Sequence, residues 1–326
     1  MYLPETYSIA VVFMFLTMFC WGSWANTQKL AKGWRFELFY WDYVFGILLT
    51  SLLFGFTLGS TGAHGQAFLS NWQSVDQQYI VSAIWGGVIF NAGNILLVAA
   101  IALAGMAVAF PVAIGIALVL GTSLNYLISP QGGSVLLALG IAFVLAAIVL
   151  DAKVYQKAMA SSDHPTGKKG LMVAVISGVL IGLFYPLVAR SMEGPLSLTP
   201  YTALFAFSIG VLVSNFVFNS ILMRKPVDGA PVSYGDYFKG SFKEHFVGIL
   251  GGSIWCVGMA LNLIAAQQAG PAIAYAFGQG ATLIAAIWGV FIWREFAGAK
   301  GVTAMLALMF ACYVAGIGFI GMARVI

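Results

Sequence analysis

Three apolar stretches carry aromatic and amide side chains at a spacing that places them on one face of a helix. The faces are Tyr275, Gln279 and Thr282; Trp255, Met259 and Asn262; and Gly87, Asn91 and Asn94, while Trp21, Trp24 and Asn26 lie close together near the N-terminus. Amides both donate and accept hydrogen bonds, and aromatic rings hold flat ligands by stacking. This combination predicts non-covalent binding of a small, uncharged, hydrogen-bonding ring, such as a ureide, a nucleobase or a pyranose.

The same side chains could serve packing instead. In lipid, polar side chains face the interior of a helix bundle, where they often join two helices. Gly278 and Gly280 flank Gln279 and would permit either an unwound backbone or close helix packing. The residues that we predict to contact a ligand are Trp24, Asn91, Asn94, Trp255, Asn262, Tyr275 and Gln279.

Two ionisable residues are candidates for coupling or gating. Asp42 follows Tyr40-Trp41 at the start of an apolar span. It could carry a coupling proton, or lie at the membrane interface and pair with a basic residue of the preceding loop (Lys29, Lys32 or Arg35); we favour the interfacial role. Arg190 could form an outer gate with Glu193.

The other ionisable residues are expected at the ends of spans. Asp151, Arg294 and Glu295 are predicted at interfaces, and His64, His164 and His245 in or beside loops. The chain offers no buried nucleophile and base, no carboxylate pair and no metal cluster, so we do not expect an enzyme. Its three cysteines lie in apolar stretches without a CxxC motif, and we expect no disulfide, metal or cofactor.

The elements that position these residues are membrane helices. Of the 326 residues, 61% are hydrophobic and 8% are charged, against about 25% charged in soluble domains. Apolar segments of ~20 residues, long enough to cross a bilayer, recur along the chain. We predict ten spans, near 7–28, 38–58, 79–103, 106–127, 134–152, 170–190, 199–222, 246–267, 271–293 and 301–323.

The two halves of the chain are similar to each other. Residues 86–121 match 251–286 without a gap at an offset of 165 positions, for example Gly93 with Gly258 and Gly105 with Gly270. We therefore predict a first five-helix repeat in 1–152, a cytoplasmic linker in 153–169 and a second repeat in 170–326. An odd number of spans in each half gives the two repeats opposite orientations, as in many secondary transporters.

Basic residues predict the orientation. All of the 15 Lys and Arg residues except Arg190 and Arg324 fall in alternate connections, which are therefore expected to be cytoplasmic. We expect an integral protein of the plasma membrane with both termini outside. The basic residues form no single patch, and no nucleic-acid partner is predicted.

Several short motifs resemble those of a known family. CWGSWAN (20–26), WDY (41–43), LGTSLNYL (120–127), TPYTALFAFSIG (199–210) and GQGATLIAAIWGVFIWREF (278–296) are similar to the ureide permease family of the drug/metabolite transporter superfamily. The related glucose/ribose uptake family shares the WGS motif and a proline at 111. The resemblance implies uptake of small uncharged heterocycles or sugars, often coupled to protons. The chain departs from it in having no mid-membrane carboxylate in its second half.

We therefore predict a secondary active transporter that takes up a small neutral polar solute, ureide-like or nucleobase-like, by alternating access, with protons as a candidate coupling ion. Two alternatives remain open. One is a sugar permease of the glucose/ribose type, and the other is a multidrug or metabolite exporter of the same fold.

Overall fold

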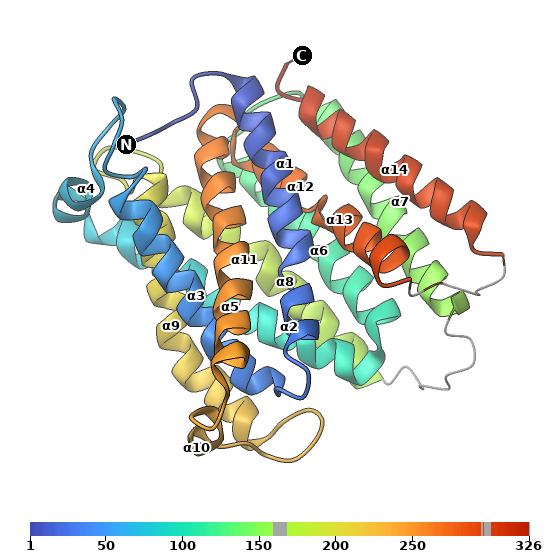
Figure 1. The fold of residues 1–326 in the computed structure, drawn as a ribbon. Helices are drawn as coiled ribbons and strands as arrows, with labels where there is room; N and C mark the ends of the chain where they lie inside the picture. The colour runs from blue at the N-terminus through green and yellow to red at the C-terminus, as the bar shows by residue number, and fades with distance from the viewer. Residues whose placement is uncertain (159–167, 295, 297–300, 326) are drawn as a thin grey trace.

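The computed structural model describes residues 1–158, 168–294, 296 and 301–325. Within this part of the chain all regular elements are helical. Ten helical spans are long and apolar enough to cross a membrane, and they pack into one bundle (Figure 1). The prediction of an all-helical membrane protein with ten spans is confirmed.

The spans keep the predicted order, with boundaries close to those expected. They are α1 with α2 (Tyr7–Ser23 and Asn26–Leu30), α3 (Phe36–Phe56), α5 (Gln77–Ala104), α6 (Met106–Ile128), α7 (Ser134–Ala158), α8 (Lys168–Arg190), α9 (Pro200–Arg224), α11 (Phe242–Ala269), α12 with α13 (Pro271–Gly278 and Ala281–Ile287) and α14 (Thr303–Met322). A π-helical turn, Trp288–Ile292, extends α13. Two short helices, α4 (Phe68–Ser74) and α10 (Tyr234–Tyr237), lie in connections that were predicted as loops.

The bundle has two ends that differ in charge. Both termini lie at one end, which we call the terminal face, and α10 lies at the other (Figure 1). The second end carries the connections with most of the Lys and Arg residues, and we call it the basic face.

Gly105 and Gly270 make the same sharp turn in the two halves. Gly105 has φ 76° and ψ 156°, and Gly270 has φ 86° and ψ 148°. Residues with a Cβ rarely adopt a positive φ, so glycine is favoured at both turns. Pro271 begins the helix after the second turn, as predicted. The two turns are separated by the offset that relates the sequence halves.

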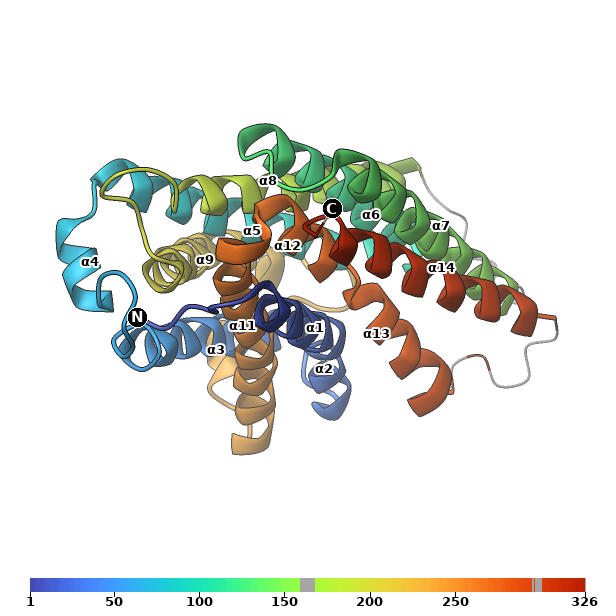
Figure 2. The same cartoon turned by 90° about the horizontal axis from the view of Figure 1, so that it is seen from above.

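Helix packing is compatible with two inverted repeats. The third span, α5, packs against α8 and α9, the first two spans of the second half. The eighth span, α11, packs in the corresponding way against α1 and α3. The last spans of the halves, α7 and α14, also lie side by side (Figure 2).

Glycines allow the closest contacts between the halves. A Cβ on Gly252 of α11 would overlap the Tyr43 carbonyl of α3. In the equivalent pair, a Cβ on Gly87 of α5 would overlap the Phe207 carbonyl of α9. Small residues at such crossings let helix backbones approach in the membrane, where close packing favours association.

We expect Gly252→Ala to lower the thermal unfolding midpoint of the purified protein. The added methyl group would force α3 and α11 apart, at a cost of about 1–3 kcal/mol for an overpacked site. Gly318→Ala is the matched control, because a Cβ there meets nothing within 4 Å. Equal midpoints for the two variants would contradict close packing at Gly252.

Candidate binding cavity

A cavity of about 230 Å³ lies between the two halves of the bundle. Its wall is mainly aromatic and aliphatic, with a few polar side chains. The aromatic members are Trp21, Trp24, Phe90, Phe110, Tyr155, Phe184 and Trp255, and the polar members are Asn94, Asp151, Gln279 and Thr282. Predominantly apolar walls with a few polar groups are typical of small-molecule sites.

The cavity extends from the middle of the bundle toward the basic face. On α1 the lining begins at Trp21, late in the helix, and on α7 it lies at Asp151 to Tyr155, again near the end of the helix. On α6, which runs the opposite way, it lies near the start, at Phe110 and Pro111. All these positions belong to the half of the bundle next to the basic face.

The ninth span is interrupted beside the cavity. Helix α12 ends at Gly278 and α13 begins at Ala281, so Gln279 and Gly280 form a turn between them. Both residues keep right-handed helical backbone angles, and a Cβ on Gly278 would meet the Trp21 ring at 2.7 Å, so of the two roles considered for the flanking glycines the structure has close packing. The Gln279 side chain is 8% exposed, lines the cavity and makes no hydrogen bond to the described residues. Its amide is available to a ligand.

Stacked rings form one wall of the cavity. The Trp21 and Trp255 rings are nearly parallel, with an interplanar angle of 14° and centroids 5.9 Å apart. Phe90 lies 4.4 Å from the Trp255 ring. The Trp21 indole N–H donates to the Trp255 carbonyl at 3.2 Å, which fixes this ring in place. These rings offer flat apolar surfaces to a solute.

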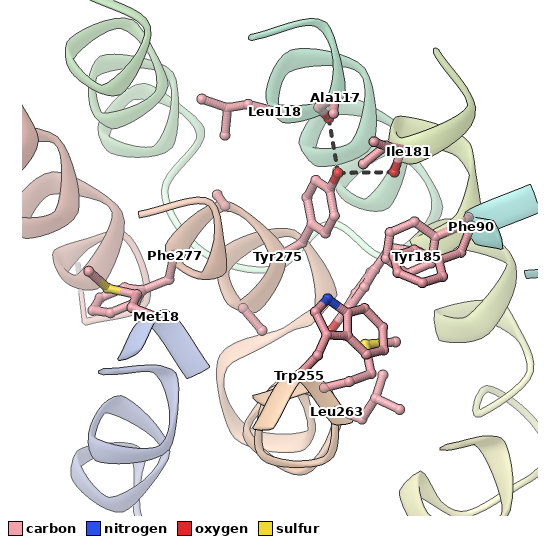
Figure 3. Close-up of a cluster of buried hydrophobic side chains, with 14 of the residues drawn as sticks. Met18, Phe90, Ala117, Leu118, Ile181, Tyr185, Trp255, Leu263, Tyr275 and Phe277 are labelled. Atoms are coloured by element: carbon pink, nitrogen blue, oxygen red, sulfur yellow. Dashed lines mark hydrogen bonds between the residues drawn. The ribbon is translucent and has the colours of Figure 1, made fainter. Parts of the chain in front are cut away.

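A buried layer separates the cavity from the terminal face. The Tyr275 hydroxyl lies 3.2 Å from both the Ala117 and Ile181 carbonyl oxygens (Figure 3). The Tyr185 hydroxyl donates to Asn262 Oδ1 at 2.5 Å. Asn262 Nδ2 in turn donates to the Ala274 carbonyl at 2.8 Å. These groups are fully buried and satisfied within the protein, so the layer closes the bundle on this side.

The structure divides the seven predicted ligand contacts into two groups. Trp24, Asn94, Trp255 and Gln279 line the cavity, whereas Asn91, Asn262 and Tyr275 do not.

Asn91 joins three helices. Its Oδ1 accepts from the Tyr40 hydroxyl at 2.9 Å, and its Nδ2 donates to Ser214 Oγ at 2.9 Å. Asn94, one turn further along α5, donates to the same Tyr40 hydroxyl at 3.0 Å but reaches the cavity wall.

Asp42 lies outside the cavity, with partners other than those predicted. It is 1% exposed, accepts from the Tyr237 hydroxyl at 2.6 Å and contacts His245 Nδ1 at 3.0 Å. Burial and the hydrogen bond to Asp42 raise the pKa of Tyr237, so this hydroxyl stays protonated and acts as the donor. His245 lies in the first turn of α11, beside the preceding connection.

The other predicted ionic contacts also differ from the structure. Arg35, a proposed partner of Asp42, instead pairs with Glu37 at 2.8 Å. Arg190 is exposed, and no ion pair with Glu193 is found in the described part of the chain. Glu295 and His164 lie outside the described residues.

Sequence reasoning missed Asp151 and Tyr155 as cavity residues. The fifth span was predicted to end at 152, which would leave Asp151 at an interface. Helix α7 continues to Ala158, and both side chains therefore lie on the cavity wall. The run AKVYQKA after Asp151 contains two Ala, two Lys and one Gln, which favour helix, and no glycine or proline, and this signal could have extended the prediction.

Asn262→Ala is expected to lower the thermal unfolding midpoint, whereas Gln279→Ala should change it little. Loss of Asn262 leaves the buried Tyr185 hydroxyl without its acceptor, which costs about 1–3 kcal/mol. Gln279 has no such bond to lose. Both variants remove one amide from adjacent spans, so each is the other's control, and similar losses would refute the division into two groups.

Comparisons with known proteins agree with this architecture. Ureide permease 2 of Arabidopsis thaliana is 24% identical over 366 residues, covering 91% of this chain and 92% of the permease. Ureide permease 4 of the same plant is 24% identical over 401 residues, covering 98% of each. One crystal structure matches with a TM-score of 0.62 at 16% identity over 96% of both chains, and it shares the fold. The model of the family described as "Sugar transport protein" matches residues 12–322, and this chain therefore belongs to that family.

Proposed function

We propose that this integral membrane protein is a secondary active transporter that takes up a small neutral polar solute, ureide-like or nucleobase-like. The two repeats, 1–152 and 170–326, would alternate around the cavity, with 153–169 linking them on the cytoplasmic side. The observation that carries the proposal is a cavity at the junction of the two halves, with stacked rings and an available amide on its wall.

The repeat itself supports a central solute site. In the ungapped run, two pairs of equivalent residues both line the cavity: Phe90 with Trp255, and Ile114 with Gln279. For other pairs only one member does, as with Phe110 and Tyr275 or Leu97 and Asn262. Positions near the axis relating two inverted repeats would border the solute whichever face is open. Trp255 and Gln279 are therefore our central binding residues.

The chemistry of the wall favours a flat polar solute. Trp21, Trp255 and Phe90 supply ring faces, and Gln279 offers two donors and one acceptor oxygen. Asn94 places a second amide on the α5 side of the cavity. An amide edge of a ureide or nucleobase can pair with a Gln side chain while its plane lies against a ring.

The two alternative functions, a sugar permease and a multidrug exporter, do not fit the cavity equally well. Family membership and ring stacking are also compatible with a sugar permease. A multidrug exporter fits less well, because the wall carries the amides of Asn94 and Gln279 among its apolar side chains.

Solute-dependent stabilisation tests the substrate class. Purified protein would be titrated with allantoin, uracil, glucose, ribose and a panel of cationic drugs, since a ligand that binds the folded state raises the unfolding midpoint. We expect a rise with allantoin or uracil, followed by uptake of the same compound into proteoliposomes. A response to the sugars alone, or to the drugs alone, would replace our proposal by the corresponding alternative.

Gln279→Ala should weaken the affinity of the identified solute about 5- to 150-fold, because an unpaired polar edge in a dry site costs about 1–3 kcal/mol. The measurement is equilibrium binding to purified protein. Gln267→Ala, which removes an exposed amide from α11, is the control and should bind as wild type. Unchanged affinity in Gln279→Ala would remove Gln279 from the site.

We place the basic face in the cytoplasm and both termini outside the plasma membrane, on the distribution of basic residues. In a variant with alanine for the native cysteines, single cysteines would replace the exposed residues Thr61 on the terminal face and Gly235 on the basic face. An impermeant maleimide should label the first in intact cells and the second only after permeabilisation. The reverse pattern would invert the topology.

We propose that Asp42 and Arg190, the two gating candidates, act at the two ends of the transport pathway and do not contact the solute. Asp42, held by Tyr237 and His245, would anchor α10 and the start of α11 to α3 on the basic face. Arg190, at the end of α8 on the terminal face, would act in the outward-open state.

A further inference from the structure

A chain of hydrogen bonds ends at the cavity wall on α5. Asn94 lines the cavity and is 6% exposed. Its Nδ2 donates to the Tyr40 hydroxyl at 3.0 Å, and that hydroxyl donates to Asn91 Oδ1 at 2.9 Å. The chain continues to α9, where Asn91 Nδ2 donates to Ser214 Oγ at 2.9 Å. Tyr40, Asn91 and Ser214 are buried behind the wall and do not border the cavity.

The far end of this chain fixes the direction of each bond. Asn91 Nδ2 also donates to the Val211 carbonyl at 3.3 Å. Ser214 Oγ donates to the Gly210 carbonyl at 2.7 Å, so this oxygen receives a proton from Asn91. Backbone carbonyls only accept hydrogen bonds, so the Asn91 amide must turn its nitrogen to α9 and its oxygen to Tyr40. The single Tyr40 proton therefore goes to Asn91, which leaves the Tyr40 oxygen as an acceptor.

The orientation of the Asn94 amide follows from this acceptor. Only the amide nitrogen can donate to the Tyr40 oxygen; with the amide turned over, two oxygens without a proton between them would face each other. Unsatisfied oxygens are costly inside an apolar bundle. The Tyr40 ring is fully buried and stacks on Tyr43 with the ring centroids 5.2 Å apart, which holds its hydroxyl in place.

The Asn94 oxygen is left for the cavity. Asn94 Oδ1 accepts no hydrogen bond from the described residues, and the surrounding protein does not enclose it completely. Because Asn94 borders the cavity, the wall on α5 offers a fixed acceptor at this point.

We propose that Asn94 is a specificity-determining residue that holds its amide oxygen, and not its nitrogen, toward the solute. The proposal rests on the transport function proposed above and narrows its solute class. The ring edge that meets α5 must carry a hydrogen-bond donor, which in a ureide or nucleobase is a ring N–H. A carbonyl or an alkylated nitrogen at this edge would leave Asn94 Oδ1 unpaired in a dry site, at a cost in affinity.

Gln279 complements this fixed acceptor. Its side chain makes no hydrogen bond to the described residues, so no partner there decides which end of its amide faces the solute. It can pair with either a carbonyl or an N–H of the solute. The offset of 165 relates Asn94 to Met259, and the second repeat therefore has no amide at the equivalent position. The donor requirement arises from the first repeat alone.

The test measures how methylation of the ring changes affinity. Equilibrium binding to purified protein would compare uracil, thymine and 1,3-dimethyluracil. Thymine adds a methyl group on carbon and keeps both N–H groups, whereas 1,3-dimethyluracil has neither. Hydantoin, 5-methylhydantoin and 1,3-dimethylhydantoin form the equivalent series for a ureide ring. In the series that wild type binds, we expect the carbon-methylated ring to bind much as the parent does, and the dimethylated ring about 5- to 150-fold more weakly.

Two variants separate the contact from the bond that orients it. Asn94→Leu keeps a similar side-chain shape but removes the acceptor, so the parent ring should lose about 5- to 150-fold in affinity while the dimethylated ring changes little. Tyr40→Phe allows the Asn94 amide to turn over, so the preference for the N–H ring should shrink while binding persists. Tyr185→Phe is the matched control, because it removes a buried hydroxyl that bonds to Asn262 away from the cavity. It should keep the wild-type preference.

The outcomes separate two kinds of failure. If wild type binds no member of either series, the proposed solute class is wrong, and the donor requirement falls with it. If wild type binds the parent and dimethylated rings equally, or is weakened as much by the methyl group on carbon, the solute class stands and the role of Asn94 is refuted. An unchanged preference in Asn94→Leu would also overturn the proposal. Equal loss of preference in Tyr40→Phe and Tyr185→Phe would assign the preference to the stability of the bundle instead of the orientation of Asn94.

Discussion

The need to satisfy polar groups within an apolar bundle determines which side chains remain for a solute. In hydrocarbon an amide or hydroxyl without a partner is costly, so most polar residues of the spans are bonded inside the protein. Asn91 is held by Tyr40 and Ser214, and Asn262 by Tyr185 and a backbone carbonyl. Gln279 differs because it lies at a helix break and faces a cavity.

Backbone geometry explains this difference. Asn91 and Asn262 lie within continuous helices, where each points toward neighbouring helices and finds its partners there. The turn at Gln279 and Gly280 interrupts the ninth span, and the helix resumes at Ala281 beside the cavity. Interrupted helices of this kind are tolerated in membranes where they border a cavity. At this turn the Gln279 amide faces the cavity and makes no hydrogen bond to the described residues.

Much of the fold could be predicted because span length, basic loops and the internal repeat are properties of the sequence. Which polar residues line the cavity and which join helices could not be predicted, because Asn262 and Gln279 have the same chemistry and both lie on apolar spans. Only the position of Tyr185, from a helix far away in sequence, shows that Asn262 is already satisfied. The place of Asp151 on the cavity wall was missed for a local reason, since its helix extends beyond the apolar run.

The two halves share a backbone pattern but differ in polarity. In the proposed transport cycle, the layers that close the two faces would therefore differ in stability. Phe110 lines the cavity, while its equivalent Tyr275 is bonded to two carbonyls in the layer that closes the terminal face. If the halves exchange conformations, Tyr275 would become a lining residue and Phe110 would pack into a closing layer that has no such hydrogen bonds. The layer that closes the terminal face is thus held by hydrogen bonds, whereas the equivalent layer closing the basic face would be apolar. Under the alternating access proposed above, identical halves would weight both states equally, whereas these hydrogen bonds would favour the state open to the basic face.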